Sequence, residues 1–166
     1  MGWSLTAPTL PGGSEWVQKD TISISHAQLD VTGTISIARL EGTNFALKIV
    51  ETRTFHLTNP NFTDFYKTYH RCDVAGVTGE ASTESRFGSS GSTKTYYFTG
   101  IAAAGAAIKV VVGVKVDNVT QEFSFAAPAL LGAPFVFNDN GTTRKVVKWM
   151  YNDNGTAKNV ILKYHT

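Results

Sequence analysis

Alternation of apolar and polar positions is the main pattern along the chain after residue 19. Apolar residues recur at every second position in four separate runs, and most of the residues between them are hydroxyl-bearing or charged. The apolar members of these runs are Ile22 and Ile24, Ile35 and Ile37, Phe45, Leu47 and Ile49, and Ile108, Val110, Val112, Val114 and Val116. A period of two places apolar side chains on one face of a strand. The pattern predicts half-buried strands, about eight to ten in total.

The C-terminal part of the chain contains a short internal repeat. The sequence Asn-Asp-Asn-Gly-Thr at residues 138–142 recurs at residues 152–156, each time directly after an aromatic residue. Asn-Gly between strand residues is typical of a two-residue hairpin, because both residues tolerate positive φ. We therefore expect a meander of three strands near 134–137, 143–151 and 157–165.

One segment, near residues 60–70, has a helical pattern. Asn59 suits a cap and Pro60 suits the first helical position. Aromatic residues then recur at steps of three and four, which is the helical period. They are Phe62, Phe65, Tyr66 and Tyr69. The pattern predicts one short helix packed across a sheet.

Residues 1–19 lack the alternation and carry Pro8, Pro11, Gly12 and Gly13. Proline and glycine at this density favour an irregular segment. We expect an extended N-terminal arm over residues 1–19, with Trp3 and Trp16 as its anchors. Residues 20–166 are expected to form a single all-β domain, an antiparallel β-sandwich or barrel, because that many half-buried strands need a second layer.

Composition narrows the functional classes. Charged residues make up 17% of the chain and the formal net charge is +2. This charge is too low to indicate nucleic-acid binding, and the 11% aromatic content argues against disorder. A single cysteine, Cys72, excludes an intrachain disulfide. The start lacks the pattern of a secretory signal, so we expect a protein delivered to an extracellular target without one, or alternatively a virion component.

Residues with catalytic or metal-binding chemistry are dispersed. The nearest approach to a metal pair is His70 with Cys72, and no second pair supplies the other ligands of a zinc site. Glu80 and Glu84 are two carboxylates in a glycine-rich stretch, where such side chains are usually solvated. We therefore expect no catalytic residues, no metal and no cofactor, and we interpret the chain as non-enzymatic.

Aromatic side chains are the remaining candidates for contact with a ligand. Tyrosine and tryptophan combine an apolar body with a polar tip, which suits sugars, lipid headgroups and protein surfaces. The candidate binding residues are Phe65, Tyr66, Tyr69, Tyr96 and Tyr97. The arm residues Trp3 and Trp16 are candidates for contact with a neighbouring subunit.

Several stretches resemble the actinoporin-like pore-forming cytolysins and related fungal lectins. They are residues 47–50 leading through 57–60 to Phe65 and Tyr66, the apolar run at 108–116, and the end from Lys145 to Lys163. The resemblance implies a β-sandwich that faces membranes or sugars. The headgroup motif of that family, Pro-aromatic-Asp-Tyr-Asn, is absent, as is its amphipathic N-terminal helix.

Two functions follow as hypotheses. The first is a membrane- or glycan-binding β-sandwich, with cytolysis as one form of it, whose partner is a lipid or glycan surface. The second is a structural assembly subunit, such as a phage tail-tube or capsid decoration protein, whose arm lies on a neighbour. A homo-oligomer is expected in either case.

Overall fold

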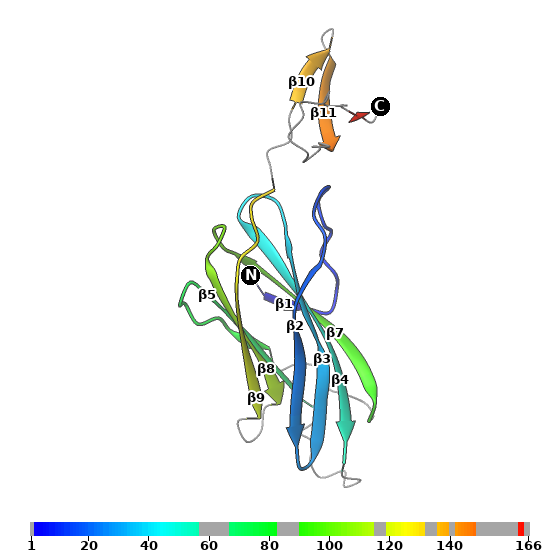
Figure 1. Cartoon of the computed structure of the whole chain (residues 1–166), viewed down its shortest axis with the longest axis vertical. Coiled ribbons are helices and arrows are strands. Elements are labelled where there is room, and N and C mark those ends of the chain that lie inside the picture. The colour runs from blue at the N-terminus through cyan, green and yellow to red at the C-terminus, as the bar shows by residue number, and fades with distance from the viewer. Residues whose placement is uncertain are drawn as a thin grey trace, which may run out of the picture.

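A computed structural model describes most of the chain as β structure (Figure 1). The described residues are 2–56, 67–82, 90–114, 119–131, 136–139, 142–148 and 163–164, the last three ranges as strand backbone. Within these residues there are strands and turns and no helix. The described part of the chain accordingly holds no helix that can cross a membrane. The all-β prediction is confirmed.

The larger sheet has five antiparallel strands in the order β1-β7-β4-β3-β2. Their bounds are β1 Gly2–Ser4, β2 Val17–His26, β3 Leu29–Arg39, β4 Asn44–Phe55 and β7 Ser92–Ile101. Strands β2, β3 and β4 form a meander, in which Ile35 pairs with Ile49. The expected arm over residues 1–19 thus contains β1 at one edge of the sheet and the start of β2 at the other.

The second sheet has four antiparallel strands in the order β6-β5-β8-β9. Their bounds are β5 Thr68–Val74, β6 Ala81–Ser82, β8 Ala107–Val114 and β9 Thr120–Ala126. The two sheets form separate layers (Figure 1), and their described strands close no barrel. Along one flank Ser23 of β2 donates its backbone N–H to Gln121 Oε1 of β9, 3.0 Å away.

The C-terminal strands form a third, small sheet. It joins β10 (Val136–Asp139), β11 (Thr142–Lys148) and β12 (Lys163–Tyr164) in antiparallel order. Asp139 pairs with Thr142, as expected of a hairpin with a two-residue connection. The predicted order of the meander is confirmed, and β10 covers residues 136–139 where the sequence indicated 134–137.

The core lies between the two larger sheets and follows the predicted parity. Phe45, Leu47 and Ile49 of β4 are fully buried, and they face Ile108 and Val110 of β8 in the same cluster. Burial of such side chains contributes about 1.5–3 kcal/mol each. The alternating pattern therefore identified the inward faces of the central strands.

The predicted helix near 60–70 is wrong where the structure tests it. Tyr69 and His70 belong to β5, while residues 57–66 lie outside the described residues. Thr68, His70 and Cys72 point into the core and the residues between them point out, which is strand periodicity. β5 pairs with the valine-rich β8 along its whole length, and this pairing favours a strand. The local spacing of the aromatic residues gives no information about that pairing.

Arg39 ties together one end of the two-sheet core. Its guanidinium is buried at the end of β3 and donates only to backbone carbonyls. The acceptors are Thr43 at 2.9 Å, Asn44 at 3.5 Å, Ala102 at 2.8 Å, Ala129 at 3.3 Å, and Pro128. One side chain thus holds the β3–β4 turn, the β7–β8 connection and the chain leaving β9.

Candidate functional site

The structure does not bring the candidate aromatic residues together. Tyr96 is 2% exposed in the core, so its ring is not available to a ligand. Tyr97 lies on the outer face of the five-stranded sheet, whereas Tyr69 lies on the outer face of the four-stranded sheet. Phe65 and Tyr66 lie outside the described residues. No shared aromatic surface is formed by the described members of this set.

Both arm tryptophans contact their own domain. The ring of Trp16 lies 5.9 Å from that of Tyr97, and Lys48 Nζ is 5.1 Å from the Trp16 ring centroid. The ring of Trp3 lies 5.2 Å from His70 and 5.1 Å from Phe98. In this structure the arm packs against the domain that carries it.

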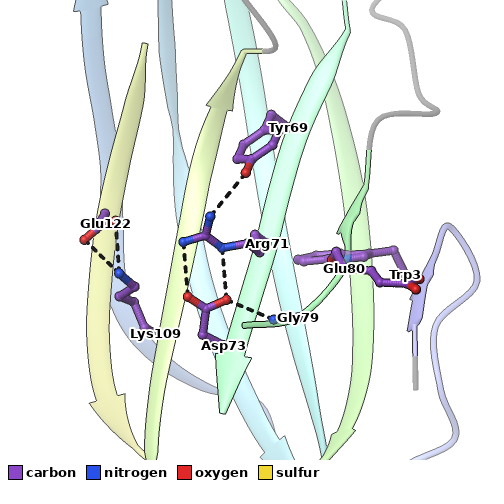
Figure 2. A network of polar contacts seen from close by, with 8 residues as sticks. All are labelled: Trp3, Tyr69, Arg71, Asp73, Gly79, Glu80, Lys109 and Glu122. Atoms are coloured by element: carbon purple, nitrogen blue, oxygen red, sulfur yellow. Dashed lines mark hydrogen bonds and ion pairs between the residues drawn. The ribbon is translucent and has the colours of Figure 1, made fainter. Parts of the chain in front are cut away.

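The outer face of the four-stranded sheet carries an ordered grid of polar side chains. Register places Asp73, Lys109 and Ser124 side by side across β5, β8 and β9. The next row contains Arg71 and Glu122 on either side of Val111. Val111 is only 3% exposed although it points outward, because charged neighbours flank it on both strands. Figure 2 shows the charged members of these rows close together.

A depression of about 630 Å³ opens on this face next to the first row. Its lining combines small side chains, polar side chains and two turns. These residues are Arg71, Asp73, Gly76, Thr78, Gly105, Ala107, Ile108, Lys109, Ser124, Phe125 and Ala126. Ala107 and Ala126 are direct partners across β8 and β9, and their small outward side chains leave the space open. An apolar floor with a few fixed polar groups is typical of small-ligand sites.

The charges around the depression are already paired. Arg71 Nε lies 2.9 Å from Asp73 Oδ1 and its Nη2 lies 3.1 Å from Oδ2, a bidentate ion pair. The hydrogen bond to Asp73 raises the pKa of Arg71 further above its ordinary value. Lys109 Nζ lies 3.2 Å and 3.3 Å from the two carboxylate oxygens of Glu122. The charged groups around the depression therefore add up to no net charge.

A tight turn after β5 forms one wall of the depression. Gly79 donates its backbone N–H to Asp73 Oδ1 at 3.1 Å, so the carboxylate that holds Arg71 also holds the turn (Figure 2). A Cβ at Gly79 would meet the Cys72 carbonyl oxygen at 2.1 Å, which explains the glycine. Ala75 and Gly76 both have positive φ, 50° and 82°, as a type I′ hairpin turn requires.

We expect Ala75→Asn to raise the free energy of unfolding by about 0.5–1 kcal/mol, because asparagine tolerates the left-handed conformation better than alanine. Denaturant unfolding measures it. The control is Ala104→Asn, at an exposed turn alanine that lacks positive φ. An equal effect of the two substitutions would contradict the assignment of strain to Ala75.

A second cluster of charged groups lies inside the core. Arg53 Nε is 2.6 Å from Glu51 Oε1, and His70 Nε2 is 2.7 Å from Glu51 Oε2. All three residues are fully buried, and Arg53 also donates to the carbonyls of Lys67 and Gly113. Burial alone raises the pKa of Glu51, but the hydrogen bond and charge of His70 and the charge of Arg53 together hold it below its ordinary value of 4.5.

The chemistry of His70 and Cys72 is limited by this burial. Cys72 is 1% exposed, and burial raises the pKa of its thiol to about 12, so the thiolate is scarce at neutral pH. Among the described residues no three His, Cys, Asp or Glu side chains gather to hold a metal ion. Inside the core, His70 pairs with a carboxylate instead of with Cys72.

Sequence reasoning missed both clusters, although signals for them existed. Glu51 and Arg53 continue the inward parity of Phe45, Leu47 and Ile49, which places two opposite charges in the core. The outer grid needs β5 to pair with β8, which lies more than 30 residues later in the chain, and no local pattern specifies that pairing. Comparison of the chain with family models finds no match, and neither a curated protein nor a solved structure proves similar to it.

Proposed function

We propose that this chain is a non-enzymatic, glycan-binding β-sandwich domain whose site is the depression on the outer face of the four-stranded sheet. The observation that carries the proposal is the lining of that depression, with alanines on its floor and hydrogen-bonding side chains on its rim. Sugars present apolar C–H faces together with hydroxyl groups, so they suit a surface of both kinds. Ser124, Thr78 and Lys109 supply hydroxyl and ammonium groups at the rim.

The charge pairing favours an uncharged ligand. Arg71 with Asp73 and Lys109 with Glu122 leave no net charge near the depression. A phosphate or carboxylate group would need an unpaired cation there to offset its loss of hydration. We therefore propose a neutral saccharide as the ligand, in preference to an anionic lipid headgroup.

The distribution of apolar surface favours a glycan over a membrane. The large apolar side chains that are exposed belong to separate segments of the described chain. They are Leu5, Val17, Val77, Ile101 and Leu130. Single exposed apolar residues are ordinary on soluble surfaces, whereas membrane contact needs a continuous patch. Cytolysis, the family resemblance and the extracellular or virion location stay predictions.

The absence of an enzymatic role is part of the proposal. Each ionisable side chain that lines the depression is engaged in an ion pair. A general base or nucleophile needs a group that is free to exchange a proton at the site. The arrangement supports binding and orientation of a ligand better than it supports turnover.

The test is binding of neutral oligosaccharides by an array, followed by calorimetric titration with the strongest of them. We expect Ser124→Trp to weaken this binding at least about tenfold, because the indole fills the depression. Thr120→Trp is the matched control, since Thr120 is exposed on the same strand and does not line the depression. Equal affinities of the two variants, or binding to lipid vesicles alone, would overturn the proposal.

A structural assembly subunit is the second candidate. Strand β1 favours it, because three residues at one edge of the sheet are joined to the rest of the chain by a nine-residue segment, 5–13, that forms no strand. Such an element is suited to contact between copies.

A further inference from the structure

Strand β1 closes one flank of the two-sheet core. It pairs with β7 through three residue pairs, Gly2 with Thr99, Trp3 with Phe98 and Ser4 with Tyr97. The Trp3 ring lies against that of His70, with 5.2 Å between the ring centroids. Its Nε1 donates to the Glu80 carbonyl, 3.3 Å away, and Figure 2 shows Trp3 beside Glu80. Glu80 directly precedes β6, so Trp3 links the edges of the two sheets.

The segment after β1 lies outside both sheets. Residues 5–13 form no strand, and Leu5 is 64% exposed. The next side-chain anchors are Ser14, whose hydroxyl donates to the Arg39 carbonyl, and Trp16 on the outer face of the same sheet. Nine residues can span up to about 30 Å when extended. The tether therefore allows β1 to reach beyond its own domain while Trp16 stays in place.

The other long edge of this sheet is closed to an added strand. On β2 the backbone N–H of Thr21 bonds to Asp20 Oδ1 at 2.8 Å, and that of Ser23 bonds to Gln121 Oε1 at 3.0 Å. A register shift between Gln18 and Asp20 interrupts the edge as well. Side-chain caps and bulges are the usual protection of edge strands. At the opposite edge, β1 itself pairs with β7 at Tyr97, Phe98 and Thr99.

We propose that β1 is an exchangeable strand and that the β7 edge it occupies is the docking site for β1 of a second copy of this chain. The second copy offers the same three residues, so every contact of Trp3 with His70 and Phe98 is reproduced. Departure without replacement exposes the buried pair of His70 with Glu51 to water, which favours an occupied site. The exchange is independent of glycan binding.

Concentration decides which β1 occupies the site. A short flexible tether gives an effective concentration on the order of millimolar, so a copy in dilute solution keeps its own strand. Exchange requires a comparable concentration of neighbours, as in an ordered array of subunits. We expect monomers at micromolar concentration and exchanged strands at about millimolar concentration.

The test mixes two variants that each carry one introduced cysteine in addition to the buried Cys72, Gly2→Cys and Thr99→Cys, whose positions are direct partners across β1 and β7. No other atom lies within 4 Å of a Cβ at Gly2, so this substitution is tolerated. A disulfide between the two variants joins different chains, because each chain carries only one of the new thiols. The mixture is incubated at about millimolar concentration, oxidised with oxidised glutathione and analysed on non-reducing gels.

We expect the yield of linked dimer to exceed that of a control mixture of Gly2→Cys with Thr120→Cys by at least about tenfold. We also expect the linked dimer to disappear when the mixture equilibrates at micromolar concentration before oxidation. Thr120 is exposed on β9 and reports random collisions. The pair Ser4→Cys with Tyr97→Cys repeats the test at a second register position. Equal yields in test and control mixtures at both positions would overturn the proposal.

Discussion

Replacing Glu51 with Gln is expected to lower the free energy of unfolding by about 3–5 kcal/mol, because the substitution leaves Arg53 as an uncompensated charge in the core. Both side chains are fully buried, and their ion-pair distance is 2.6 Å. Glu122→Gln is the matched control: it breaks an exposed pair with Lys109 and is expected to cost less than about 1 kcal/mol. Denaturant unfolding of both variants measures the difference. Equal losses would contradict the structural role of the buried cluster.

The same variant has a defined pH dependence. The pKa of Glu51 in the folded chain lies below its ordinary value of 4.5, so its ionised form stabilises the fold above that pH and the contribution is lost as pH falls. The stability gap between the parent chain and Glu51→Gln should therefore narrow below about pH 4.5. Asp30, whose pKa is lowered by hydrogen bonds from Ser25 and His56, titrates in the parent chain and in the variant alike, so its contribution cancels in the stability difference. A gap that stays constant down to about pH 3 would contradict this assignment.

Replacing Arg39 with Met is expected to lower the free energy of unfolding by about 3 kcal/mol or more, because removal of the guanidinium leaves buried carbonyls without a donor and each such group costs about 1–3 kcal/mol. The affected carbonyls include those of Ala102 and Ala129, in two different connections. Thermal unfolding monitored by circular dichroism measures the loss.

Arg39→Lys separates the charge from the geometry of the side chain. Lysine keeps the positive charge but lacks the planar fork that reaches several carbonyls at once. We expect the lysine variant to recover less than half of the loss, and hydrogen exchange to rise at Ala102 and Ala127, whose backbone N–H groups bond across this end. Full recovery by lysine would show that charge alone is required at this position.

The inward faces of the strands were predictable because they depend on a local property. The alternation at 45–49 and 108–114 reports a strand that is buried on one side, wherever its partners lie. The pairing of Asp139 with Thr142 was also predictable locally, since Asn-Gly between strand residues is typical of a two-residue hairpin connection. These elements needed no knowledge of the rest of the chain.

The helix near 60–70 shows the opposite case. Tyr69 lies three residues after Tyr66 and four after Phe65, which fits a helix, yet Tyr69 and Arg71 also lie on either side of His70, which fits the alternation of a strand. The choice between the two periods depends on pairing with β8, which lies about 40 residues later in the chain and is invisible to a local pattern.

The candidate site was not predictable for the same reason. Its row of Asp73, Lys109 and Ser124 exists only when β5, β8 and β9 are paired in register. Strand parity places the candidate aromatic residues that the structure describes in three different regions, the core and the outer faces of the two larger sheets. Parity alone could have placed Tyr96 in the core, because it lies two residues before Phe98 and therefore on the same face of β7.

The most direct test of the proposed binding face is the map of amide chemical-shift changes when the strongest neutral oligosaccharide from the array is added to isotope-labelled protein. We expect the largest changes at Thr78, Lys109 and Ser124, around the depression. Residues on the outer face of the five-stranded sheet, such as Thr32 and Lys48, should remain unchanged. Changes centred on Trp16 and Tyr97, or no saturable change at any amide, would contradict it.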